Sequence, residues 1–319
     1  MTTTKPVLLK LPAVDQKIRY AFAYWPLTLR NLLLPHRLRP DAARRYAAPI
    51  VITSQLREAW HALYQTPDQQ QPVPYLYNQS VGTLMYLKIF RDLGINFQNV
   101  RHASHTVEHP LGTEAFATSN HQTIICAVDG CWKIDDRKVL IDLHTEVRSG
   151  ENGQLLLASI IDSFVILRTA PSATEHLPTI DRRKMLRLAA AAPRRKSTGP
   201  RPAPRAIVQF DAPHDLGRRY GKVSGDNNPV HTSRLASSLF GIPRPFMQGL
   251  CLRNAVIGAL ASHGTPAETL SMSFISPAIL GQTFNIHIHN ADFEVQDQAG
   301  VTVSLGKFST PRADSSLMT

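Results

Sequence analysis

A basic, proline-rich segment in the middle of the chain does most to limit how this sequence can fold. Between Asp181 and Arg205 it carries nine lysine and arginine side chains against the single carboxylate of Asp181. The wider stretch from Pro171 to Pro204 has few of the aromatic and β-branched residues that build a core, although residues 181–192 are good helix formers and are predicted to form a short basic helix. We therefore expect a linker between two domains. The predicted N-terminal domain, linker and C-terminal domain span residues 1–175, 176–205 and 206–319.

The C-terminal part contains one helical pattern followed by strand patterns. Residues 246–262 (FMQGLCLRNAVIGALAS) place apolar side chains at helical spacing and are long enough for a buried helix. Short apolar runs separated by Pro, Gly and Asn predict strands. These strands are expected at residues 206–210, 269–275, 283–289, 292–297 and 301–308. The region is therefore predicted to combine one helix with an antiparallel sheet.

The N-terminal part repeats this order of elements. A helix is predicted over residues 80–94, where Gly94 ends it, and its apolar residues, such as Met85, Tyr86, Leu87 and Phe90, are interpreted as core rather than as the lining of an acyl tunnel. Strands are expected at residues 100–109, 122–128, 139–148 and 155–168, with a hairpin turn at 150–153. The shared order of helix and strands indicates two similar α+β units.

The composition is that of a chain that can bury a sizeable core. Hydrophobic residues make up 43% of it, and no run approaches the roughly eighteen apolar residues that a membrane span needs. Its start lacks the apolar region of a secretory signal, so we expect a cytoplasmic protein whose cysteines, Cys126, Cys131 and Cys251, are reduced. The formal net charge of +11 comes mostly from the predicted linker. Because the linker lacks aromatic residues for base stacking, we expect no nucleic-acid partner.

One run of residues carries a specific chemical signal. It reads Tyr-Gly-Lys-Val-Ser-Gly-Asp-Asn-Asn-Pro-Val-His over residues 220–231, and Pro-Phe-Met-Gln-Gly-Leu follows at residues 245–250. A proline between Asp226 and His231 prevents a regular helix, so a tight turn can bring both side chains to one water molecule. This combination resembles the signature of MaoC-like and (R)-specific enoyl-thioester hydratases. The resemblance implies a hot-dog fold.

The layout of the whole chain is similar to that of the double hot-dog 3-hydroxyacyl-thioester dehydratases of bacteria. The similarity implies an α+β fold in which each half is an antiparallel sheet wrapped around a central helix, with a degenerate first half. It implies the reversible conversion of (R)-3-hydroxyacyl thioesters into trans-2-enoyl thioesters and water, without a cofactor. The expected partners are acyl thioesters of coenzyme A or acyl carrier protein, and a second copy of the chain in a homodimer. The carrier, the acyl length and the direction of the reaction stay open.

The same resemblance assigns roles to individual residues. Asp226 and His231 form the acid–base pair, and Asn228 orients the loop. Gly249 opens the central helix, where a backbone N–H can face the thioester oxygen. Substrate-binding roles fall to Ser224, Gly225, Gln248 and Asn254. Gln248 stands where the family usually has histidine, and it can donate a hydrogen bond but cannot carry a proton at neutral pH. This departure leaves a second hypothesis, a noncatalytic acyl-thioester-binding or scaffold protein.

Two further hypotheses concern features outside the motif. Histidines at positions 102, 105 and 109 suggest a metal site, but residues 102 and 105 face opposite sides of a regular strand, so we expect no bound metal. The charge of the linker suggests a basic adaptor for nucleic acid. Hydration of crotonyl-coenzyme A, followed by the loss of enoyl absorbance, separates an enzyme from both noncatalytic alternatives.

Overall fold

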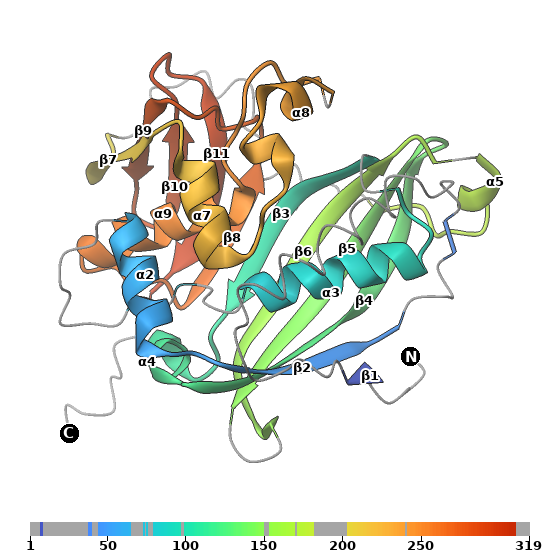
Figure 1. The fold of residues 1–319 in the computed structure, drawn as a ribbon, viewed down its shortest axis with the longest axis horizontal. Helices are drawn as coiled ribbons and strands as arrows, with labels where there is room; N and C mark the ends of the chain where they lie inside the picture. Colours follow the sequence, from blue (N-terminus) through green and yellow to red (C-terminus); the bar gives the residue numbers. More distant parts are fainter. Residues whose placement is uncertain are drawn as a thin grey trace.

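The computed structural model describes residues 7–8, 38–39, 44–64, 73, 75, 79–96, 99–149, 153–169, 171–181, 203–239 and 241–310. The N-terminal half contributes the strands β1 (Val7–Leu8), β2 (Tyr46–Val51), β3 (Val100–Glu108), β4 (His121–Asp135), β5 (Lys138–Ser149) and β6 (Leu155–Leu167). The C-terminal half contributes β7 (Ala206–Ala212), β8 (Thr269–Phe274), β9 (Gln282–Ile288), β10 (Asp292–Gln296) and β11 (Thr302–Ser309). Within the described residues they form one sheet of eleven strands, in the order β1-β2-β4-β5-β6-β3-β8-β11-β10-β9-β7 (Figure 1).

Each half of this sheet packs against one central helix (Figure 1). In the N-terminal half this is α3 (Gln79–Asp92), and the predicted core role of Met85, Leu87 and Phe90 is confirmed because all three are buried. In the C-terminal half it is α9 (Gly249–Ser262), in which every residue from Cys251 to Leu260 is buried. A helix that is buried all round needs cover on every side, and the curved sheet supplies much of it.

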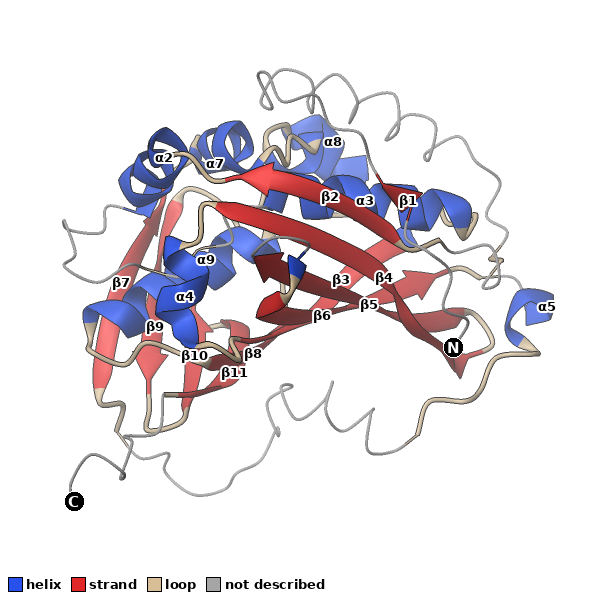
Figure 2. Cartoon of the chain, turned by 90° about the horizontal axis from the view of Figure 1, so that it is seen from below, coloured by secondary structure: helices blue, strands red, loops and turns tan. Residues whose placement is uncertain are grey.

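The two halves join through their strands and through side chains. Strand β3 pairs with β8 in antiparallel fashion, with Ser104 opposite Ser273 and Glu108 opposite Thr269. Two shorter helices, α2 (Ser54–Tyr64) and α7 (Leu216–Ser224), lie side by side over this junction (Figure 2). The Tyr64 hydroxyl donates a hydrogen bond to the carbonyl of Cys251, 3.1 Å away. These contacts make the central region a shared core rather than a hinge.

Most of the predicted elements are present. The helices expected at 80–94 and 246–262 correspond to α3 and α9, and every strand predicted in either half has its counterpart. The sequence patterns did not reveal β2, α2, α4 (Gly112–Thr118) or α7. Other described helices are short: α5 (Pro171–Thr174), α8 (Arg234–Leu239) and a 3₁₀ turn at Pro229–His231.

The predicted linker is described only at its two ends. Its first residues pack on the N-terminal sheet, because Ile180 donates a backbone hydrogen bond to Lys133 of β4 and is buried. Residues 182–202, which include nearly all of the predicted basic helix, lie outside the described residues, as do residues 150–152 of the predicted hairpin turn. Among the described helices, none is both long and apolar enough to cross a membrane. Cys126, Cys131 and Cys251 are free cysteines.

Candidate active site

The loop that carries the motif begins at the C-terminus of α7. Gly225 caps this helix in the left-handed conformation, with φ of 78°, and donates a hydrogen bond to the Gly221 carbonyl. Glycine adopts this conformation without steric cost, so it turns the chain sharply out of the helix. The Ser224 hydroxyl then accepts a hydrogen bond from the backbone N–H of Asp226, at 3.1 Å. Ser224 and Gly225 therefore shape the turn that presents Asp226.

Hydrogen bonds within the loop hold the next residues in place. A carboxylate oxygen of Asp226 accepts from the backbone N–H of Asn228, at 3.3 Å. The side-chain oxygen of Asn228 accepts in turn from the N–H of Val230, also at 3.3 Å, and so caps the 3₁₀ turn. These bonds satisfy backbone donors that a short turn cannot pair internally. The turn places His231 at its last position.

His231 is held in a defined tautomer. Its Nδ1 lies 2.8 Å from the carbonyl oxygen of Phe246, which can only accept, so Nδ1 carries the proton and Nε2 presents a lone pair. Burial lowers the pKa of His231, and the nearby Asp226 and the Phe246 carbonyl oppose that shift. The imidazole is therefore neutral at pH 7. A neutral imidazole with a free Nε2 can accept a proton from water.

Two glycines of α7 bring the helix into direct contact with the loop. A side chain at Gly217 would collide with the backbone carbonyl of His231. A Cβ at Gly221 would lie 2.7 Å from the side-chain oxygen of Asn227 and 2.9 Å from the carbonyl of Asp226. Our sequence analysis did not identify this pair, although glycines four positions apart share one face of a helix and mark a close approach.

The start of α9 lies against the same loop. Gln248 precedes the helix and is buried, and its amide nitrogen donates to the carbonyls of Gly217 (3.2 Å) and Asp226 (3.3 Å). Gly249 is the first helical residue, and the helical hydrogen bonds to the Gln248 carbonyl begin with Cys251 and Leu252. The N–H groups at the helix start, with the helix dipole behind them, therefore suit a partly negative oxygen.

Asn254 stands apart from this network. It is buried one turn further along α9, and its side-chain oxygen accepts a hydrogen bond from Arg253 at 2.8 Å. Its amide nitrogen is buried and has no hydrogen-bond partner among the described residues. The hydrogen bonds therefore connect Ser224, Gly225, Asp226, Asn228, His231 and Gln248 into one loop-and-helix unit, with Gly249 beside it. Within the described part of the chain, no side-chain hydrogen bond joins Asn254 to them.

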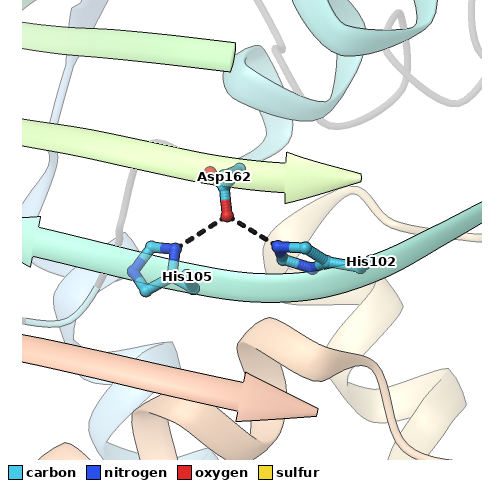
Figure 3. Close-up of side chains that lie close together, drawn as sticks. All are labelled: His102, His105 and Asp162. Carbon is cyan, nitrogen blue, oxygen red and sulfur yellow. Dashed lines mark hydrogen bonds and ion pairs between the residues drawn. The ribbon is translucent and has the colours of Figure 1, made fainter. Parts of the chain in front are cut away.

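A second polar cluster lies in the N-terminal half (Figure 3). One oxygen of Asp162, on β6, is 2.7 Å from His102 Nε2 and 2.8 Å from His105 Nδ1, both on β3. Our prediction that residues 102 and 105 face opposite sides of the strand is wrong. A β-bulge between His102 and Ser104 shifts the register, so both rings point to the same carboxylate. The sequence gives no clear signal for such a bulge.

The geometry of this cluster is that of a hydrogen-bonded network. The three candidate ligand atoms lie within 4.8 Å of one another, and the Asp162 oxygen lies at hydrogen-bond distance from both rings, 2.7 Å from His102 Nε2 and 2.8 Å from His105 Nδ1. Burial alone raises the pKa of Asp162, but His105 and His102 hold it well below its usual range. Its second oxygen accepts from the hydroxyl of Tyr86, on α3. Asp162 is therefore an ionised, buried acceptor that ties α3 to β3 and β6.

Comparisons with known proteins agree with this architecture. Residues 193–308 match the family model described as the MaoC-like domain. The 3-hydroxyacyl-thioester dehydratase X of Mycobacterium tuberculosis is 32% identical over 91 residues, which are 28% of this chain and 32% of that protein. The matched region thus spans about a third of the length of this curated relative.

Solved structures extend the likeness to both halves. The crystal structure of HtdX from Mycobacterium tuberculosis has a TM-score of 0.61 at 18% identity, covering 84% of this chain and 100% of that chain. A double hot-dog protein from Mycobacterium tuberculosis has a TM-score of 0.51 at 13% identity, covering 84% and 95%. At these identities the likeness concerns the fold.

Two helix-wrapped sheets joined edge to edge define a double hot-dog protein, as the resemblance implied. Residues 193–308, which contain the motif, are similar to the MaoC-like domain family.

Proposed function

We propose that this chain is a hydro-lyase that interconverts trans-2-enoyl thioesters and (R)-3-hydroxyacyl thioesters. The observation that carries the proposal is the set tautomer of His231, whose Nε2 lone pair is available on the loop that also presents Asp226. The names of the relatives, a 3-hydroxyacyl-thioester dehydratase and a MaoC-like domain, support the same reaction class.

The chemistry needs three functions, and the candidate site offers each of them. In hydration, the Asp226–His231 pair holds one water and removes a proton from it as its oxygen bonds to C3 of the enoyl group. Negative charge then develops on the thioester oxygen, which the N–H groups at the start of α9 stabilise. The pair returns one proton to C2 on the same face, so the addition is syn. The reaction therefore adds one water molecule across the C2–C3 double bond, with the hydroxyl on C3 and the hydrogen on C2.

Gln248 favours this proposal over a noncatalytic binding protein. The amide nitrogen of the buried Gln248 donates to two carbonyls and so holds the Asp226 loop against α7, which is the positioning that a working loop needs. Its amide nitrogen supplies the kind of hydrogen bond that a histidine N–H supplies. We propose coenzyme A or acyl carrier protein as the carrier of the acyl group, since both present a thioester.

The test is a hydration assay on a series of trans-2-enoyl-coenzyme A esters, from crotonyl to long chains, followed by the loss of enoyl absorbance. We expect turnover with at least part of the series and an (R)-3-hydroxyacyl product on chiral analysis. Failure to hydrate any chain length, while the thioesters still bind, would support the noncatalytic binding protein instead. An (S) product would contradict the assigned geometry.

A further inference from the structure

The His102–Asp162 pair has no role in the proposed hydration, yet its geometry is closely defined by burial and hydrogen bonds. Asp162 is 1% exposed and His105 is fully buried, whereas the side chain of His102 is 21% exposed. His102 is therefore the member of the cluster that solvent or a ligand can reach. A buried ionised carboxylate fixes its ring in one orientation, which is how proteins position an imidazole for use.

The position of His102 links it to the candidate active site. Its ring lies between two phenylalanine rings, those of Phe164 and Phe274, each with its centroid 4.7 Å away. Phe274, in the C-terminal half, also lies against the start of α9, where a Cβ on Gly249 would be 3.0 Å from its ring. The single ring of Phe274 thus bridges His102 and the helix N-terminus that we assign to the thioester oxygen.

Aromatic packing continues from His102 into the buried core of the N-terminal half. The ring of Phe164 makes edge contacts with Phe90 (5.1 Å) and Tyr86 (5.6 Å) of α3. An apolar acyl chain that leaves the thioester along Phe274 reaches the imidazole of His102 at the edge of this core. A polar edge within an aromatic wall selects the group that can pair with it.

The free edge of His102 defines what that group is. A carboxylate only accepts, so Nε2 donates to Asp162, and in the neutral form of the imidazole Nδ1 then carries a lone pair. Within the described residues, Nδ1 has no hydrogen-bond partner. The complementary ligand group is a hydrogen-bond donor attached to a hydrocarbon chain.

We propose that His102, oriented by Asp162, is a specificity-determining residue that selects acyl thioesters bearing a hydroxyl group on the acyl chain beyond C3. This inference rests on the proposed function, because it assumes that the acyl group leaves the start of α9 along Phe274. It names a substrate class, hydroxylated acyl thioesters, and a hydrogen bond from the substrate hydroxyl to Nδ1.

The experiment compares coenzyme A esters of one chain length, either unsubstituted or with one hydroxyl moved stepwise from C5 to the chain end. Dissociation constants of the saturated esters, which cannot be hydrated, are measured by calorimetry, and KM and kcat are measured for the trans-2-enoyl esters. For at least one hydroxyl position we expect roughly two- to tenfold tighter binding than for the unsubstituted ester, the range of one neutral hydrogen bond. The gain should appear in KM rather than in kcat, because the bond is the same in ground and transition states.

The variant His102→Phe keeps a ring between Phe164 and Phe274 and removes the acceptor, so the preference should disappear. His144→Phe is the matched control. His144 lies on β5, which pairs with the β6 strand of Asp162, and it bonds Ser159 instead of Asp162. It should keep the preference. If no hydroxyl position is preferred, or if His102→Phe keeps the preference, the inference is overturned. Binding without any turnover would contradict the proposed hydration while leaving the selection by His102 measurable.

Discussion

Gln248 is a single buried side chain that holds the Asp226 loop in place. Its amide nitrogen is the donor for the carbonyls of Gly217 and Asp226; the first hydrogen bond is buried and the second is partly buried. A buried carbonyl that loses its partner costs about 1–3 kcal/mol. Under the proposed function, we therefore expect Gln248 to act by positioning Asp226 rather than on the substrate through its own chemistry.

Substitutions at Gln248 separate these roles. We expect Gln248→Leu to lower kcat by about tenfold or more and the free energy of unfolding by about 1–3 kcal/mol, because both carbonyls lose their donor. Gln248→His keeps one N–H donor and should retain most of the activity. Steady-state kinetics and urea denaturation of both variants check this. A Gln248→Leu enzyme with wild-type kcat would remove Gln248 from the positioning role.

His109 makes a second residue-scale prediction, on pH and stability. Burial, with the charge of Arg253 adding to it, lowers the pKa of His109 to about 3 from an unfolded value near 6.5. The folded state thus binds this proton later than the unfolded state does as the pH falls. Neutral His109 therefore contributes its full stabilisation above about pH 6.5, and this contribution declines progressively between about pH 6.5 and pH 3.

We therefore expect unfolding free energies, measured by urea at pH 7.5, 6 and 5, to fall with pH, and His109→Phe to reduce that fall. Phenylalanine suits the site because His109 already contacts the ring of Phe116, at 4.7 Å. The matched control is His121→Phe at an exposed position, which should leave the fall unchanged. An equal pH dependence in wild type and His109→Phe would show that His109 does not contribute.

At the residue scale, the sequence predicts the tight turn of the motif but leaves the roles of its residues as predictions. Ser224, Gly225, Asp226, Asn228 and His231 follow one another along a turn, so local rules for turns place them together. The His102–Asp162 pair could not be found in this way. It depends on a bulge in β3 and on pairing with β6, sixty residues later in the chain.

At the scale of elements, the start of α9 is the most sensitive point. A Cβ on Gly249 would lie 3.0–3.3 Å from three ring atoms of Phe274, which is tighter than most real contacts. We expect Gly249→Ala to move the helix start or the ring by a few tenths of an ångström and to lower kcat by roughly threefold to tenfold. Adding Phe274→Leu, which makes room, should restore part of that loss. Kinetics of the two variants test this, and a double variant no better than Gly249→Ala would contradict the steric explanation.

The elements that the sequence did not reveal, or revealed only in part, have separate physical causes. The strand β2 contains Pro49, which a pattern search takes as a sign against a strand. The strand β4 was expected to end at residue 128, but it continues past an irregularity at Gly130 to Asp135. The helix α4 has only seven residues, too few to show a periodic pattern. Long periodic elements such as α9 and β6 are the ones that local patterns predict.

At the scale of the whole molecule, the β3–β8 seam makes the two halves depend on each other. A fragment of residues 206–319 loses β3, the partner of β8, and also loses the Tyr64 contact to α9. An open strand edge beside exposed core invites pairing with another copy. The N-terminal half thus covers the half that carries the candidate active site.

We therefore expect the isolated fragment of residues 206–319 to be poorly soluble or to associate with itself. The full chain should stay soluble, without such aggregation, at the same concentration. Sedimentation analysis of both checks this. A folded, monomeric fragment with full activity on long acyl chains would show that the N-terminal half has a different role.

The central claim is that Asp226 and His231 act together on one water in the C-terminal half. Its most direct test is kcat for crotonyl-coenzyme A hydration, or for the best enoyl ester, by Asp226→Asn, His231→Gln and the double variant, with circular dichroism to verify folding. We predict that each single variant loses at least about a hundredfold in kcat and that the double variant is little worse than either, because the two groups form one unit. Near-normal kcat in either folded single variant, or losses that multiply in the double variant, would contradict this account.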